Sequence, residues 1–237
     1  MEPSQNPEIA RDKATRKLPR AQVLLLAVFL VLYPLFQLLL NLFAPQNSLQ
    51  VESKIAQLYV PTLVLQILIL ASILMAIIKD GETLASLGIK RKDFSWINLG
   101  ISIGFMIFAL VFLNVLHLAL SSLGLPISKD IALILPRTIA ERIIWIILAI
   151  MTGVSEEICF RGFVISRMGI LTRSVWPGVV LGSLAFSIGH SYQGIGGVIV
   201  IGTYGLMFAL LFLARGSLVP CIIAHALQDI LASFTNI

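Results

Sequence analysis

The sequence predicts an all-α protein, a polytopic bundle of about seven transmembrane helices. Its 237 residues are 58% hydrophobic and only 12% charged, with a mean hydropathy of +0.96. A soluble domain has about twice that charged fraction. Apolar segments also recur along the whole chain, and most of them are close to the ~20 residues that a helix needs to cross the hydrocarbon core.

The expected membrane spans, in chain order, cover residues 21–43, 59–78, 96–120, 142–164, 175–191, 195–213 and 217–235. The first span is too long for the apolar core of a signal peptide and no small-residue cleavage site follows it, so we expect it to be retained. The fourth span contains charged residues and is the least regular. Residues 129–141 mix charges with short apolar runs, which suits an interfacial or re-entrant helix and would raise the number of helices to eight.

Basic residues predict the orientation of this bundle. Residues 1–20 form a polar tail ahead of a single membrane domain, residues 21–237, and the tail holds five of the 17 Lys and Arg residues. Counted over alternate loops, twelve basic residues lie on the side of the N-terminus and four on the other side, and Arg161 is left out because it lies within a span. The positive-inside rule therefore predicts a cytoplasmic N-terminus and an external C-terminus. The compact size suits a prokaryotic plasma membrane.

The most informative motif is Glu156-Glu157 followed by Arg161, inside the fourth apolar segment. A charge near the bilayer centre costs roughly 2.5–3.5 kcal/mol, so three charges there indicate a function. On an α-helix Glu157 and Arg161 share a face, whereas Glu156 is rotated away from both. We therefore expect Arg161 to neutralise Glu157 and Glu156 to act as a general base toward water. The alternative is a buried ion network that only fixes helix packing.

Two further motifs lie in later spans, each with a four-residue spacing that places its members on one helix face. In the first, Phe186 offers an apolar wall and His190 a proton acceptor that could share a water with Glu156. In the second, Asp229 could accept a hydrogen bond from one ring nitrogen of His225, leaving the other nitrogen to stabilise an oxyanion. Packing roles for both histidines are the alternative.

These three motifs, in this order, resemble the CPBP family of intramembrane proteases, which includes the type II CAAX prenyl endopeptidases and the bacterial Abi proteins. The resemblance covers roughly residues 138–235 and includes Phe160-Arg161-Gly162 and the Arg215-Gly216-Ser217 approach to His225. It implies a bundle of membrane helices that encloses an intramembrane cavity. It also implies a membrane endopeptidase in which Glu156 and His190 activate water, His225 and Asp229 stabilise the oxyanion, and Glu157, Arg161 and Phe186 support the site. Asp229 departs from the asparagine common in the eukaryotic-type enzymes, which either favours a role in orienting His225 or requires Asp229 to be protonated.

No cofactor is favoured, although a bound zinc ion is the alternative. Glu156, His190, His225 and Asp229 could supply two nitrogen and two oxygen ligands. However, the sequence has no His-Glu-x-x-His pair, and Arg161 would oppose a dication. Cys221 is a further conceivable ligand, but small-residue packing is the preferred interpretation. His117 is interpreted as an interfacial or packing residue.

The expected partners are the lipid bilayer and a membrane-associated peptide or protein substrate, with no role for nucleic acid. On the predicted topology the charged motif lies in the cytoplasmic half of the membrane, near the turn between Arg167 and Arg173. Two other functional classes stay open. One is a non-proteolytic scaffold or bacteriocin self-immunity protein. The other is a proton-coupled transporter, which is disfavoured because the two halves of the chain show no related, interrupted helices.

Overall fold

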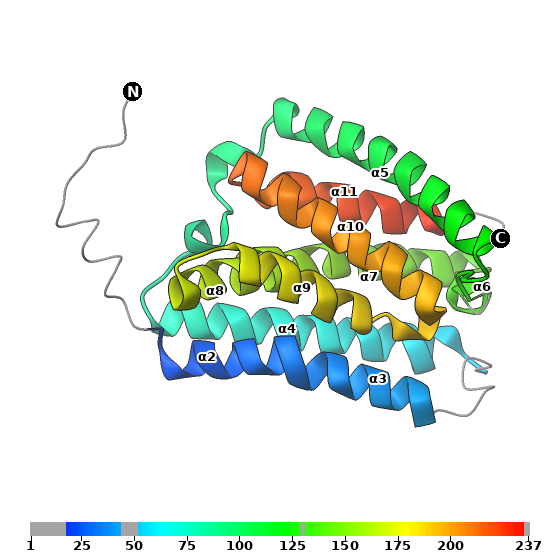
Figure 1. The fold of residues 1–237 in the computed structure, drawn as a ribbon, viewed down its shortest axis with the longest axis horizontal. Coiled ribbons are helices and arrows are strands. Elements are labelled where there is room, and N and C mark those ends of the chain that lie inside the picture. Colours follow the sequence, from blue (N-terminus) through cyan, green and yellow to red (C-terminus); the bar gives the residue numbers. More distant parts are fainter. Residues whose placement is uncertain (1–17, 44–51, 129–130, 235–237) are drawn as a thin grey trace.

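The computed structural model describes residues 18–43, 52–128 and 131–234, and within these ranges every regular element is a helix. The helices run back and forth between two ends of an elongated bundle (Figure 1). The predicted all-α polytopic helix bundle is therefore confirmed. The polar tail and its basic residues up to Lys17, together with Lys129 and Asp130, lie outside the described residues.

The first three crossings come from the N-terminal half of the chain. The first is one continuous helix, in which the π-helical segment η1 (Val28–Leu32) joins α2 (Arg20–Ala27) to α3 (Tyr33–Phe43). The second consists of η2 (Ile55–Tyr59) and α4 (Val60–Lys79). Two short 3₁₀ helices, η3 (Leu84–Leu87) and η4 (Arg91–Asp93), lead to α5 (Trp96–Ser122).

The remaining crossings form the part that contains the three motifs. A single turn, α6 (Ile131–Ile134), precedes a continuous 34-residue helix made of α7 (Ile139–Glu156), η5 (Glu157–Val164) and α8 (Ile165–Thr172). Thr138 and Glu141 form a capping box that starts α7, which satisfies its first backbone amides. After it come α9 (Trp176–Ile188), η6 (Ser191–Gln193), α10 (Gly194–Arg215) and α11 (Val219–Ala232).

All seven expected spans correspond to helices. Within the described residues, five helices are long and apolar enough to cross a membrane, and α9 and α11 are shorter apolar helices. These two begin where a proline stands in the first turn, Pro177 and Pro220, as is usual for helix starts. The expected interfacial segment at 129–141 contains α6. The carbonyl of Ile134, the last residue of α6, accepts a hydrogen bond from Tyr59 Oη, and that of Leu135, the next residue, accepts one from Lys54 Nζ.

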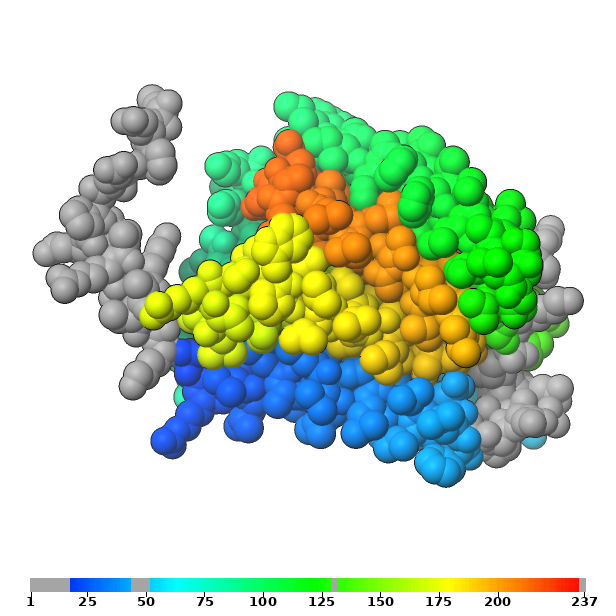
Figure 2. Space-filling model, in the orientation of Figure 1, coloured from blue at the N-terminus to red at the C-terminus, as the bar shows by residue number. Residues whose placement is uncertain are grey.

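Figure 2 shows one face of the bundle, formed by α2 and α3 (blue), α9 (yellow), α10 (orange) and α5 (green). Large apolar side chains are exposed on α2 and α3, on α5 and on α9, including Leu24, Phe36, Phe108, Phe112 and Leu184. In water so continuous an apolar surface would promote aggregation, whereas in a bilayer it faces lipid chains of equal polarity. The protein is therefore an integral membrane protein.

Glycines bring the motif-bearing helices close together. A Cβ on Gly178 would lie 2.7 Å from Ile165 Cα, so α9 packs directly on the backbone of α8. A Cβ on Gly153 would lie 3.0 Å from the backbone nitrogen of Ala226, so α7 and α11 are also in close contact. Small residues allow such approach between membrane helices. The contact at Gly153 sets the distance between the Glu156-Glu157 pair and His225.

Candidate active site

Arg161 and Glu157 form a buried ion pair, as the i, i+4 spacing predicts. Arg161 Nη1 lies 2.8 Å from Glu157 Oε1, and neither side chain is more than 2% exposed. Arg161 Nη2 donates to the carbonyl of Gly205 at 3.1 Å. The guanidinium carbon also lies 4.6 Å from the ring centroid of Phe186 and 5.1 Å from that of Phe208, within cation–π distance. Hydrogen bonds and aromatic faces thus surround this charge in place of water.

Glu156 has one engaged carboxylate oxygen and one free oxygen. Its Oε1 accepts a hydrogen bond of 2.8 Å from Gln66 Nε2 of α4. Its Oε2 is buried and has no hydrogen-bond partner within the described part of the chain, although it lies 3.8 Å from His225 Nε2. A buried carboxylate oxygen without a partner is costly, and such exceptions require an explanation.

His225 lies between the two glutamates, which corrects two expectations. Its Nδ1 is 2.9 Å from Glu157 Oε1, within hydrogen-bond distance, whereas its Nε2 is 3.6 Å from Asp229 Oδ2, which is too long for a hydrogen bond. Glu157, and not Asp229, therefore orients the His225 ring. The expectation that Glu156 points away from Glu157 was also wrong, because the two glutamates approach the two nitrogens of one imidazole.

The physical reason lies in the packing of a second helix. Glu156 and Glu157 both keep α-helical backbone angles, although the π-helical segment η5 begins at Glu157. The close contact of α11 with α7 at Gly153 brings His225 to both glutamates, and an argument from one helix cannot include this contact.

Phe186 and His190 lie on one face of the end of α9, as expected. Their ring centroids are 4.8 Å apart, and the ring of Phe186 also meets that of His225 at 6.2 Å, nearly edge to face. His190 Nδ1 lies 2.8 Å from the carbonyl oxygen of Phe186. Since a carbonyl can only accept, Nδ1 bears the proton, and Nε2 of the neutral ring is an acceptor.

Asp229 is at the most accessible edge of this cluster. Its side chain is 30% exposed, and its backbone carbonyl accepts a hydrogen bond of 2.7 Å from Trp145 Nε1. Its carboxylate interacts electrostatically with His225, Glu156 and His190. The four residues expected to be catalytic therefore gather in one region, which α7, α9, α10 and α11 surround.

Sequence reasoning missed several residues of this region. Gln66 is buried and bonds to Glu156, and Gly205 leaves room for Arg161, since a Cβ there would lie 3.4 Å from Arg161 Nη2. The hydroxyl of Tyr204 is buried without a hydrogen-bond partner among the described residues, and the ring centroid of Tyr204 lies 6.4 Å from that of His225. A polar residue within an apolar span is itself a signal, and it could have drawn attention to Gln66.

A zinc site needs three or four donors directed at one point. Across residues 18–43, 52–128 and 131–234, no three His, Cys, Asp or Glu side chains are arranged in this way. His225 Nδ1 is engaged by Glu157, and Cys221 Sγ faces the carbonyl of Phe208 at 3.6 Å. The ligands of the zinc alternative, Glu156, His190, His225 and Asp229, form no such group among these residues.

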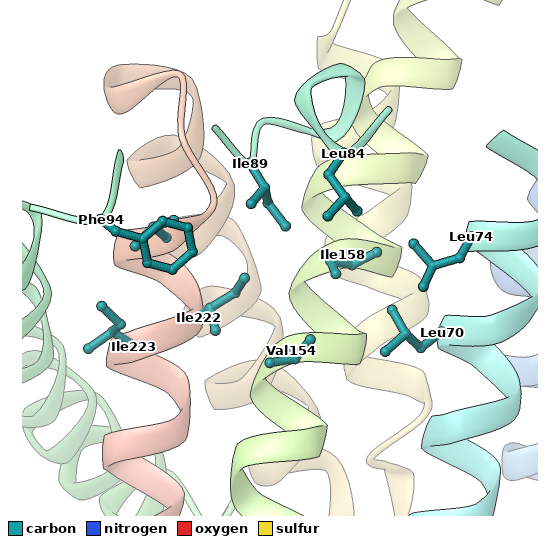
Figure 3. Close-up of a pocket in the computed structure, with 10 residues that line it drawn as sticks. Leu70, Leu74, Leu84, Ile89, Phe94, Val154, Ile158, Ile222 and Ile223 are labelled. Carbon is teal, nitrogen blue, oxygen red and sulfur yellow. The ribbon is translucent and has the colours of Figure 1, made fainter. Parts of the chain in front are cut away.

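An apolar pocket lies between α4, α7 and α11 (Figure 3). It measures about 300 Å³, and α4, α7, η5 and α11 form it together with the segment that joins α4 to α5. Val154 and Ile158 in its wall stand two residues either side of Glu156, Ile222 stands one turn before His225, and Leu70 one turn after Gln66. Leu84, Ile89 and Phe94 close its other side. All of its lining side chains are apolar. Because two residues turn an α-helix by about 200°, the face of α7 that lines this pocket is not the face that carries Glu156.

The cluster extends from the middle of the bundle toward the end where α6 lies. Glu156 is the eighteenth residue of the 34-residue helix that starts at Ile139. Asp229 follows His225 toward the end of α11, which lies on the side of α6, opposite the α8 to α9 turn (Figure 1). The site therefore does not lie near the Arg167–Arg173 turn as expected, and with a cytoplasmic N-terminus, which is at the same end as that turn, it would not lie in the cytoplasmic half (Figure 1). Arg167, one of the twelve basic residues on the side of the N-terminus, is buried and pairs with Glu82 at 2.7 Å.

Comparison with known proteins adds one finding. The comparisons with curated proteins and with solved structures each give no match. Residues 138–231, by contrast, match the Rce1-like family, described as type II CAAX prenyl endopeptidase Rce1-like. The match includes all three motifs and agrees with the resemblance drawn from them. Residues 138–231 are thus similar to the Rce1-like type II CAAX prenyl endopeptidases, which is consistent with the CPBP family of CAAX proteases.

Proposed function

We propose that the protein is an intramembrane endopeptidase that hydrolyses a peptide bond of a membrane-associated substrate with water activated by Glu156 and His190. The observation that supports this most is the buried Oε2 of Glu156, which has no hydrogen-bond partner among the described residues and lies 3.8 Å from His225 Nε2. A general base needs an oxygen of this kind, free to take a proton yet fixed in position.

Each side chain then has a role in one sequence of steps. Glu156 takes a proton from water, and the water oxygen attacks the carbonyl carbon of the scissile bond. The carbon–nitrogen bond then breaks, and the proton held by Glu156 passes to the leaving nitrogen. His190 Nε2 is the second acceptor for the water, since its Nδ1 donates to Phe186.

His225 and Asp229 would stabilise the oxyanion that forms during the attack. In the doubly protonated ring of His225, Nδ1 donates to Glu157 and Nε2 donates to the oxyanion. Asp229, 3.6 Å from that nitrogen, balances the charge of the imidazolium. Arg161 pairs with Glu157 and so supports His225 indirectly, through Glu157. No metal ion takes part in these steps.

The apolar pocket supports a substrate with an apolar group, such as the isoprenoid chain of a prenylated CAAX-type peptide. Its volume of about 300 Å³ is at the lower end of the range for ligand pockets. Leu84, which is 42% exposed, lines its rim. Leu84→Trp should therefore raise KM for a prenylated peptide, whereas Val180→Trp on the lipid-facing surface should leave KM unchanged.

The positive-inside count supports a cytoplasmic N-terminus in what we propose is a prokaryotic plasma membrane. The cluster would then lie between the membrane centre and the outer face. Single cysteines at exposed positions 91 and 123, labelled in intact cells by a membrane-impermeant thiol reagent, test this. Labelling at 123 alone would agree with a cytoplasmic N-terminus. Labelling at 91 alone would contradict it, because the orientation of the bundle would then be the opposite one.

Purified protein in nanodiscs, incubated with farnesylated and unmodified peptides ending in Cys and three further residues, tests the proposed activity. We expect mass spectrometry to detect loss of the last three residues from the farnesylated peptide. Equal cleavage of both peptides would contradict a preference for prenylated substrates but would still support an endopeptidase. Intact peptides throughout, with a folded protein, would contradict the proposal and favour a scaffold or immunity protein.

A further inference from the structure

Gln66 is a buried polar side chain of α4, far in sequence from the three motifs. It is 3% exposed and lies in a helix that is otherwise strongly apolar. It is also outside residues 138–231, which the family match covers. An amide within a membrane span is unfavourable unless its donors and acceptor find partners.

Both ends of this amide are bonded to α7. Gln66 Nε2 donates to Glu156 Oε1 at 2.8 Å, and Gln66 Oε1 accepts a hydrogen bond from the hydroxyl of Ser155. A carboxylate oxygen can only accept, and a hydroxyl can donate to the amide oxygen. The two bonds therefore agree on one orientation of the amide. One side chain of α4 thus holds two consecutive residues of α7.

This arrangement determines which oxygen of Glu156 is free. Because Oε1 is held by Gln66, the carboxylate cannot rotate without losing a buried hydrogen bond, which is unfavourable. The other oxygen, Oε2, then stays directed toward His225 Nε2. We propose that Gln66 is a positioning residue that presents Oε2 of Glu156 to the catalytic water, with Ser155 fixing the orientation of its amide. The kinetic part of this inference rests on the proposed function.

Gln66→Met keeps the length and apolar fit of the side chain but removes both hydrogen bonds. Gln22→Met is the matched control, because Gln22 is fully buried and also bonds between helices, to Asp80 at 2.6 Å and to Glu82 at 3.3 Å, but not to the cluster. We expect Gln66→Met to lower kcat about 10- to 100-fold with KM unchanged, as for misplacement of a reacting group. Gln22→Met should leave kcat unchanged.

Ser155→Ala gives a second kinetic test. It should lower kcat less than Gln66→Met, and the double variant should be no slower than Gln66→Met alone, since Ser155 acts only through the amide. Equal kcat values for Gln66→Met and Gln22→Met would overturn the inference, as would additive losses in the double variant. A purely structural role would lower the melting temperature and leave kcat of the folded fraction unchanged.

Infrared spectroscopy tests the same inference without turnover. The carboxylate band of Glu156 is assigned as the band that disappears in Glu156→Gln. In Gln66→Met this band should shift, because the carboxylate loses its amide donor, and in Gln22→Met it should not. An unshifted band in Gln66→Met refutes the inference even if no peptide is cleaved. A shifted band without any cleavage by the wild type would support the positioning and refute the protease.

Discussion

Removal of the charge of Arg161 should be among the most destabilising single changes in this protein. Arg161→Met deletes an ion pair of 2.8 Å to Glu157, a hydrogen bond of 3.1 Å to Gly205 and contacts with two aromatic rings. Glu157, 0% exposed, would keep its charge with only His225 beside it. Breaking a buried pair in this way costs about 3–5 kcal/mol, which is roughly a hundred- to several-thousand-fold change in the folded to unfolded ratio.

The free energy of unfolding can be measured by denaturation with sodium dodecyl sulfate in mixed micelles, followed by the fluorescence of the three tryptophans. Arg161→Met combined with Glu157→Gln should recover part of the loss, because no unpaired charge remains buried. Arg91→Met is the control, since Arg91 is exposed and should tolerate the change. A loss below about 1 kcal/mol for Arg161→Met, or a double variant less stable than the single one, would refute this reasoning.

Three further predictions follow from single features. Tyr204→Phe removes a buried hydroxyl without a partner among the described residues and should raise the free energy of unfolding by about 1 kcal/mol; a lower value would indicate a bonded hydroxyl. Gly178→Ala places a methyl group 2.7 Å from Ile165 Cα and should cost about 1–3 kcal/mol, and an unchanged melting temperature would contradict the close packing of α9 on α8. Exhaustive chelation should leave peptide cleavage unchanged, whereas a loss of cleavage that zinc restores would support the metal alternative.

The membrane helices could be predicted from sequence because the bilayer imposes one length on each of them. The boundary errors were largest at the fourth span, expected at 142–164, which continues as one helix to Thr172. The pair of Glu157 and Arg161 was predictable for a similar reason, since an i, i+4 contact depends only on one helix. The same applies to Phe186 and His190.

Contacts between helices were not predictable in this way. The position of His225 between the two glutamates depends on the close contact of α7 and α11 at Gly153. The role expected of Asp229 in orienting His225 failed because Glu157 was nearer. Gln66 belongs to no motif, so only the fold could bring it to Glu156.

The central claim is that the free carboxylate oxygen of Glu156 activates water within the membrane. Its most direct test is the rate of peptide cleavage by Glu156→Gln in nanodiscs, compared with Glu52→Gln, a change at an exposed glutamate. We predict that Glu156→Gln lowers kcat about 10²- to 10⁴-fold at an unchanged melting temperature, as loss of a general base does, and that Glu52→Gln cleaves at the wild-type rate. Equal rates for the two variants would contradict the account.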